Sequence, residues 1–174
     1  MSDKSKEVVI VGAVRTPIGA YKGFLKDIKA HQLGSLVINE LLKRSNIQKD
    51  EIDEIVMGQV LTAGAGQNPA RQAAVNAGIP YSKPAHTINQ VCGSGLRAVI
   101  SGYQSIKLGE VKIVICGGQE NMSIAPHSVF FRDKKEILKE ELIDTMINDG
   151  LLDAFKKYHM GITAENVAKK FKIS

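Results

Sequence analysis

The 174-residue sequence contains no tryptophan, and aromatic residues make up only 5% of it. Proteins that hold single-stranded nucleic acid stack the bases on aromatic side chains, so this scarcity argues against such a function. The net charge of +5 does not reverse the argument, because acidic and basic residues are interspersed and no basic tail is present. We therefore expect no nucleic-acid partner. The mild positive charge is equally consistent with binding of a polyanionic small molecule and with an ordinary solvated surface.

Cysteine is also scarce, with only two residues, Cys92 and Cys116. Such a pair forms neither a disulfide framework nor a zinc-ligand pattern, and no acidic pair has metal-ligand spacing, so we expect no metal. No apolar run approaches the roughly 20 residues that a membrane-spanning helix needs. Residues 1–7 are polar and do not resemble a secretory signal. These absences predict a protein of the reducing cytoplasm, with no membrane association.

The first 120 residues do contain an alternation of short apolar runs and helix-like segments. An apolar run without alternation is typical of a strand buried on both faces of a parallel sheet. The expected strands cover residues 8–11, 55–61, 84–88 and 112–116, and the expected helices cover residues 33–44, 68–78 and 95–108. Asn68 is the expected N-cap of the second helix, with Pro69 at its first position. This βαβαβαβ order predicts an α/β fold, with right-handed crossovers and helices on both faces of the sheet.

The pattern changes after residue 120, where no further buried strand is expected. The remaining sequence has helix-like segments at residues 136–147, 151–158 and 164–171. Thr163 is the expected N-cap of the last of them. We therefore predict two domains: an incomplete amino-terminal core over residues 1–120, and the start of a smaller helical unit over residues 121–174.

Cys92 is the candidate nucleophile. It lies between a strand expected to end at Ile88 and a helix expected from Gly95, where unpaired N–H groups and the helix dipole favour a thiolate. Gly93 and Gly95 leave space beside the sulfur, so that an acyl group could approach and be accepted. The commoner alternative for a lone cysteine is a small core hydrophobe. Cys116, inside an apolar strand, is expected to be such a packing residue.

Residues 89–95, Asn-Gln-Val-Cys-Gly-Ser-Gly, resemble the nucleophile motif of the thiolases, which comprise acetyl-CoA acetyltransferases and 3-ketoacyl-CoA thiolases. Further motifs follow the same family in the same order. They are Val-Arg-Thr-Pro-Ile-Gly at 14–19, Gly-Gln-Asn-Pro-Ala-Arg-Gln at 66–72, Gly-Gly-Gln-Glu-Asn-Met-Ser at 117–123 and Tyr-His-Met-Gly at 158–161. The resemblance covers nearly the whole chain but only the amino-terminal part of the family.

The resemblance implies a thiolase-like core with a helical loop domain, truncated before the last core strand and the carboxy-terminal domain. In the family the fifth strand of this sheet follows the loop domain. We therefore expect one edge of the sheet to be left unpaired here.

The resemblance also implies a reaction: condensation of two acetyl-CoA molecules to acetoacetyl-CoA and CoA, or the reverse thiolysis, through an acetylated Cys92. Coenzyme A thioesters are then substrates, and no cofactor is expected. Leu151, His159 and Met160 resemble residues that line the substrate pocket. The family's catalytic histidine and second cysteine belong to the part not matched here, so this chain alone is not expected to be active. We expect a homo-oligomer, or a second chain that supplies the missing half.

Two alternatives stay open. The chain could be a non-catalytic remnant that binds acyl-CoA or a partner through its open sheet edge. It could also belong to a degradative 3-ketoacyl-CoA thiolase, although the Tyr-His-Met-Gly motif is typical of the short-chain biosynthetic branch.

Overall fold

The computed structural model describes residues 7–133 and 135–174; residues 1–6 of the polar amino-terminal segment lie outside them. The chain forms two compact units, Met1–Ile124 and Ala125–Ser174. Among the described residues, no helix combines the length and the apolar character needed to cross a bilayer.

Unit 1 is built on a parallel sheet of three strands in the order β2-β1-β3. The central strand β1 (Glu54–Gly58) pairs with β2 (Ala85–Ile88) on one side and with β3 (Val114–Gly118) on the other. Ile55 and Val56 of β1 are completely buried, as expected for a strand covered on both faces. The predicted α/β class with a parallel sheet is confirmed.

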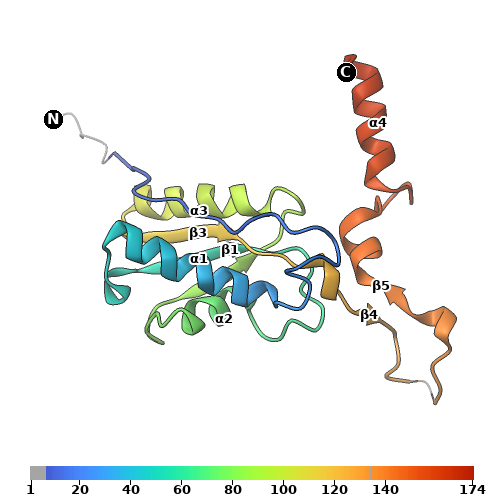
Figure 1. Cartoon of the computed structure of the whole chain (residues 1–174), viewed down its shortest axis with the longest axis horizontal. Coiled ribbons are helices and arrows are strands. Elements are labelled where there is room, and N and C mark those ends of the chain that lie inside the picture. The colour runs from blue at the N-terminus through green and yellow to red at the C-terminus, as the bar shows by residue number, and fades with distance from the viewer. Residues whose placement is uncertain (1–6, 134) are drawn as a thin grey trace. The chain divides into compact units, whose positions relative to one another are not determined.

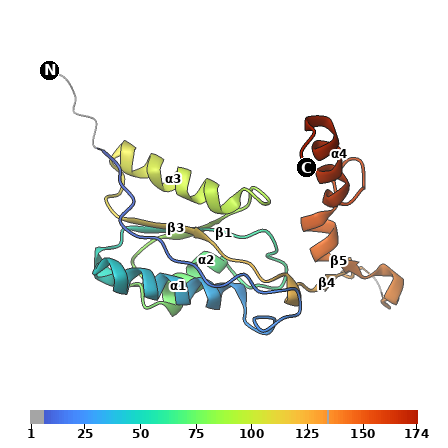
Figure 2. The ribbon, with the colours of Figure 1, turned by 45° about the horizontal axis from the view of Figure 1, so that its top comes forward.

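Helices cover both faces of this sheet. Figures 1 and 2 show α1 (Ala30–Ser45) and α2 (Pro69–Asn76) on one side and α3 (Ser94–Leu108) on the other. The main core lies between the sheet and the first two helices. It contains Ile38, Leu42, Ile52, Ile55, Met57, Ala70, Ala73, Ala74, Ala77, Ile79 and Ile115. The alanines of α2 have almost no exposed surface, so their small size lets α2 pack closely.

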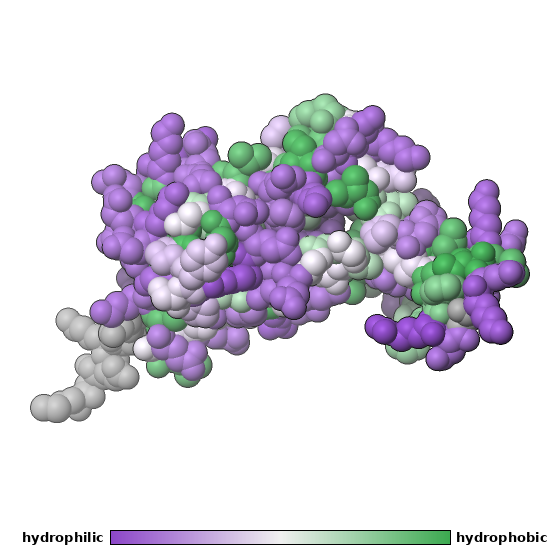
Figure 3. All heavy atoms as spheres, turned by 90° about the horizontal axis from the view of Figure 1, so that it is seen from below, coloured by the Kyte–Doolittle hydropathy of each residue, from purple (hydrophilic) through white to green (hydrophobic). Residues whose placement is uncertain are grey.

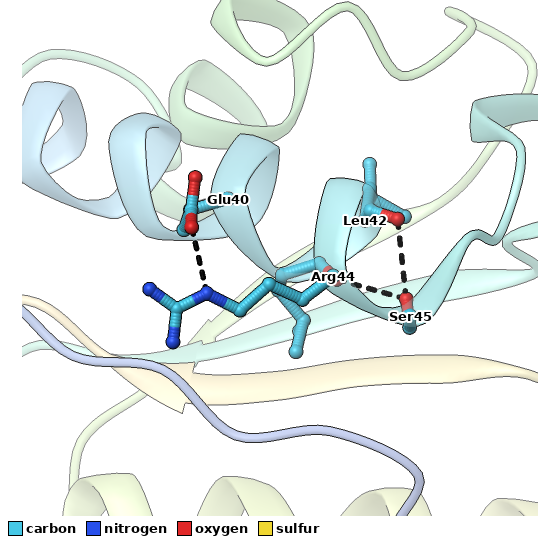
Figure 4. A network of polar contacts seen from close by, with 5 residues as sticks. Glu40, Leu42, Arg44 and Ser45 are labelled. Atoms are coloured by element: carbon cyan, nitrogen blue, oxygen red, sulfur yellow. Dashed lines mark hydrogen bonds and ion pairs between the residues drawn. The ribbon is translucent and has the colours of Figure 1, made fainter.

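The start of α2 follows the sequence prediction. The Asn68 side chain accepts a hydrogen bond from Arg71 N at 3.2 Å, and Pro69 takes the first helical position. The end of α1 is also held by side chains. Arg44 pairs with Glu40 at 2.6 Å, and the Ser45 hydroxyl donates to the carbonyls of Leu41 and Leu42 (Figure 4).

The strand predicted at residues 8–11 is not formed. This segment has no strand partner in the part of the chain that the structure describes, and Val9, Ile10 and Val11 are 63%, 80% and 67% exposed. A cavity of about 500 Å³ is lined by residues 7–14 and by residues 112–118 around β3, with α1 and α3 completing its walls. Because β3 pairs only with β1, its outer edge is open, which confirms the expected unpaired edge within the described residues.

Unit 2 departs further from the sequence prediction. The prediction of helices at residues 136–147 and 151–158 is wrong. The first range holds a 3₁₀ turn (Lys139–Glu141), the strand β5 (Ile143–Asp144), which pairs with β4 (His127–Ser128), and the start of a π-helix (Met146–Leu151).

Aspartate side chains explain both errors. The Asp144 carboxylate accepts hydrogen bonds from the N–H groups of Met146 and Ile147. Asp153 does the same for Phe155 and Lys156. Such local bonds stabilise turns and compete with a continuing helix.

The last helix is confirmed, although it begins earlier than expected. Helix α4 spans Met160–Phe171, and its N-cap is His159 rather than Thr163. The His159 Nδ1 atom accepts a hydrogen bond from Gly161 N at 2.9 Å, so an imidazole takes the role that the sequence pattern assigns to a hydroxyl.

Candidate active site

Cys92 lies at the carboxyl-terminal edge of the parallel sheet, in the turn that joins β2 to α3. This edge is where α/β proteins bind ligands, because the connecting loops there are not constrained by the sheet. The Cys92 side chain is exposed, so its sulfur is open to a reactant. Ser94, which is only 4% exposed, begins α3 two residues later. The predicted position of the cysteine, before the first turn of a helix, is therefore observed.

The Ser94 hydroxyl fixes the shape of this turn. It donates a hydrogen bond to the Val91 carbonyl at 2.6 Å and accepts one from Gln90 N at 2.8 Å. The end of β1 packs directly below, where a Cβ on Gly58 would lie 2.5 Å from the Ser94 carbonyl carbon. Any larger residue at Gly58 would push the start of α3, and the turn with it, away from the sheet.

Val91 has a left-handed backbone, with φ of +48°. This conformation is a genuine outlier for a β-branched residue, and such residues collect at functional sites. The cost is about 1–3 kcal/mol, which the surrounding hydrogen bonds must offset. The strained residue is the immediate neighbour of Cys92.

Two residues that follow β3 reach the same edge of the sheet. Gln119 donates from Nε2 to Gln59 Oε1 at 2.9 Å, and Gln59 donates in turn to the Leu61 carbonyl. Glu120 accepts hydrogen bonds through Oε2 from Val60 N at 2.8 Å and from Leu61 N at 3.3 Å. Burial raises the pKa of the Glu120 carboxyl above its ordinary value, and the backbone hydrogen bonds oppose that rise.

The sequence placed Glu120 in the family motif at residues 117–123 and showed no metal-ligand spacing for it, but it did not predict these contacts. The available signal was its place directly after a strand of a parallel sheet, which brings it to the edge that carries Cys92. In the described part of the chain, no group of three or more His, Cys, Asp or Glu side chains could hold a metal ion.

Cys116 differs from Cys92 in its surroundings. It lies within β3 and packs against Gly102 of α3. The contact is so close that a Cβ on Gly102 would be 2.3 Å from the Cys116 sulfur. Burial raises the pKa of the Cys116 thiol to about 11. Its environment fits the expected packing role and disfavours the thiolate form.

The remaining candidate residues belong to unit 2. His159 and Met160 are brought together at the start of α4, where Thr163 also contacts the Met160 sulfur at 3.9 Å. Leu151 is the half-buried last residue of the π-helix, and its neighbour Leu152 forms a β-bridge with His159. Cys92 belongs to unit 1. That Leu151, His159 and Met160 line the substrate pocket of Cys92 therefore stays a prediction.

Comparison with known proteins agrees with the sequence motifs. The family model described as the thiolase amino-terminal domain matches residues 8–174. A probable acetyl-CoA acetyltransferase of Escherichia coli (strain K12) is 53% identical over 170 residues, which are 97% of this chain and 43% of that protein. The cytosolic acetyl-CoA acetyltransferase of Rattus norvegicus is 51% identical over 174 residues, which are 100% of this chain and 44% of that protein.

An acetyl-CoA acetyltransferase of Cupriavidus necator is 53% identical over 169 residues, covering 97% of this chain and 43% of that protein. The chain therefore spans less than half the length of these relatives. With a family match over almost every residue, the chain belongs to the thiolase family.

Proposed function

We propose that Cys92 is the acyl acceptor of an acetyl-CoA acetyltransferase, which condenses two acetyl-CoA molecules to acetoacetyl-CoA and CoA or runs the reverse thiolysis. The observation that carries the proposal is the exposed sulfur of Cys92, held beside the strained Val91 at the carboxyl-terminal edge of the sheet. The names of the relatives, all acetyl-CoA acetyltransferases, support this choice of substrate.

The first half-reaction forms a covalent intermediate. The Cys92 thiolate attacks the thioester carbonyl of acetyl-CoA, a new C–S bond forms, and the CoA thiolate leaves and takes up a proton. The glycines on either side of Ser94 place no side chain beside the sulfur, which leaves Cys92 exposed to the thioester; a Cβ on Gly93 would lie 3.3 Å from Gln90, and one on Gly95 would lie 3.9 Å from Gly118. No redox step occurs, so no cofactor is required.

The second half-reaction needs a base that removes a proton from the methyl group of a second acetyl-CoA. The resulting carbanion attacks the acetyl-cysteine carbonyl, and the Cys92 thiolate leaves as acetoacetyl-CoA forms. The resemblance assigns this step to the family's second cysteine, and activation of the Cys92 thiol to a histidine in a Gly-His-Pro motif, which this sequence does not contain. We propose that both groups come from the region of the relatives beyond the match, in the same protein or in a second chain, and that the assembly is a homo-oligomer.

The substrate pocket would draw on unit 2. Leu151, His159 and Met160 are proposed to contact the pantetheine and acyl parts of the thioester, since apolar and imidazole groups suit a largely apolar substrate arm. The rat relative is named as cytosolic, which supports a cytoplasmic location for this protein.

The test is the intact mass of the chain after incubation with acetyl-CoA, alone and together with the remaining carboxy-terminal part of the Escherichia coli relative. We expect a gain of one acetyl group in the mixture, present in Cys116→Ala and lost in Cys92→Ala. Absence of the acetyl adduct from the mixture, with both parts folded and associated, would contradict the proposal.

A second candidate function rests on the exposed apolar surface of unit 1. Leu96, Tyr103 and Leu108 of α3 are 68%, 48% and 75% exposed, and the edge of β3 is open. A non-catalytic module that binds a partner through this surface would associate with the carboxy-terminal part yet never acquire the acetyl group.

A degradative 3-ketoacyl-CoA thiolase would instead react faster with long acyl chains than with acetoacetyl-CoA.

A further inference from the structure

Two carboxylates join β1 to β3, one at each end of the strand pair. At the amino-terminal end, Asp53 Oδ2 accepts hydrogen bonds from Lys112 N at 2.7 Å and Ile113 N at 3.1 Å. At the carboxyl-terminal end, Glu120 Oε2 accepts the N–H groups of two successive residues after β1. The two carboxylates make the same kind of contact, but only Glu120 lies at the edge that carries Cys92.

A chain of hydrogen bonds leads from Glu120 to the cysteine turn. Glu120 holds Val60 by its N–H group, and the Val60 carbonyl accepts a hydrogen bond from Asn89 Nδ2 at 3.3 Å. The other end of the same amide, Asn89 Oδ1, accepts Val91 N at 2.9 Å. Val91 is the strained residue directly before Cys92.

From this connection we propose that Glu120 is a positioning residue for Cys92, acting through Val60 and Asn89 on the backbone of Val91. Its consequence for acyl transfer rests on the function proposed above, whereas its effect on the turn does not.

The physical reason is that Asn89 is exposed and needs a fixed partner to keep one orientation. The Val60 carbonyl provides that partner. Glu120 accepts the N–H groups of residues 60 and 61, while the Gln59 side chain reaches only the Leu61 carbonyl. Without the carboxylate, the N–H groups of Val60 and Leu61 lose their acceptor. Leu61 is only 8% exposed, so the segment must shift toward water to replace the lost bonds. The shift moves the Val60 carbonyl and releases the Asn89 amide.

The test compares Glu120→Ala with its matched control Asp53→Ala, each in the 174-residue chain, by amide hydrogen exchange. Exchange is followed at Val91, Gly93 and Ser94, whose N–H groups all form hydrogen bonds within the turn. We expect Glu120→Ala to speed their exchange about tenfold relative to Val56 in the centre of β1, the effect of losing one hydrogen bond. Asp53→Ala should instead speed exchange at Lys112 and Ile113 and leave the turn unchanged. Unchanged exchange at the turn in Glu120→Ala, or equal changes in both variants, overturns the proposal.

Two further variants separate positioning from general loosening. Glu120→Gln keeps an acceptor oxygen and should restore most of the protection at the turn, which also guards against a poorly folded alanine variant. In an Asn89→Ala background, Glu120→Ala should have little further effect on Val91, because the proposed route is already broken. An undiminished effect in that background would show that the route does not run through Asn89.

Acyl transfer is measured separately, in the mixture with the carboxy-terminal part. The initial rate of Cys92 acetylation should fall about tenfold in Glu120→Ala and stay unchanged in Asp53→Ala. If no variant, wild type included, becomes acetylated, the proposed function fails, and the exchange result still decides whether Glu120 positions the turn.

Discussion

At the scale of single residues, the two cysteines have opposite surroundings and should differ in reactivity. Cys92 is exposed, whereas burial raises the pKa of Cys116 to about 11. The thiolate is the reactive form, so at pH 8 Cys116 stays a thiol and is also shielded by α3. We expect iodoacetamide to modify Cys92 first, leaving Cys116 unmodified until the chain is unfolded. Peptide mapping measures this, and equal labelling of both residues in the folded chain would contradict it.

The backbone at Val91 gives a second prediction at this scale. Glycine adopts a positive φ without steric cost, so Val91→Gly should relieve strain and raise the free energy of unfolding by about 1 kcal/mol. The matched control is Val99→Gly in the middle of α3, which should lower it by about 1 kcal/mol. Denaturant unfolding measures both. A destabilised Val91→Gly would show that contacts of the valine side chain outweigh the relief of strain.

At the scale of elements, His159 has a structural contact that competes with its proposed place in the substrate pocket. As the N-cap of α4 it accepts a hydrogen bond from Gly161 N, and loss of a capping side chain costs about 1 kcal/mol. We expect His159→Ala to speed amide exchange over the first turn of α4, and His159→Asn to restore it, because asparagine is a strong N-cap residue.

The same pair of variants separates the two roles of His159. If His159→Asn keeps the helix yet weakens binding of acetoacetyl-CoA in the mixture with the carboxy-terminal part, the imidazole contacts substrate. If His159→Asn binds acetoacetyl-CoA as wild type does, the residue serves only as a cap and its proposed pocket role is wrong.

Local signals predicted the elements whose ends are fixed by nearby residues. Helix α2 starts at Asn68 and Pro69 as predicted, and Cys92 lies directly before α3 as predicted. Both features depend on residues that are neighbours in the sequence. The strand at residues 8–11 failed because strand formation needs a distant partner, which an apolar run cannot reveal. The contacts of Glu120 were missed for the same reason, since they join segments about 60 positions apart.

At the scale of the whole molecule, the apolar surface of unit 1 is distributed unevenly. Figure 3 draws one face of the whole chain, on which hydrophilic residues predominate and hydrophobic residues form separate patches. Val9, Ile10 and Val11 are exposed and line a cavity of about 500 Å³ that is also lined by the residues of β3. An unpaired apolar segment and an open strand edge that line one cavity are suited to receive an added strand.

We therefore expect a strand from the carboxy-terminal part of a relative to fill this cavity when the two parts are mixed. Backbone hydrogen bonds to the inserted strand should slow amide exchange at residues 9–11 and along β3 by about tenfold or more. Ile10→Asp is the informative variant: Ile10 is 80% exposed in the chain alone, so the change should leave its stability unaltered and yet weaken association, because the charge would become buried on insertion. Thr62→Asp, at another exposed position of unit 1, is the matched control and should associate normally. Association that leaves exchange at residues 9–11 unchanged, or that tolerates Ile10→Asp, would mean that the cavity stays unfilled and that the two parts join elsewhere.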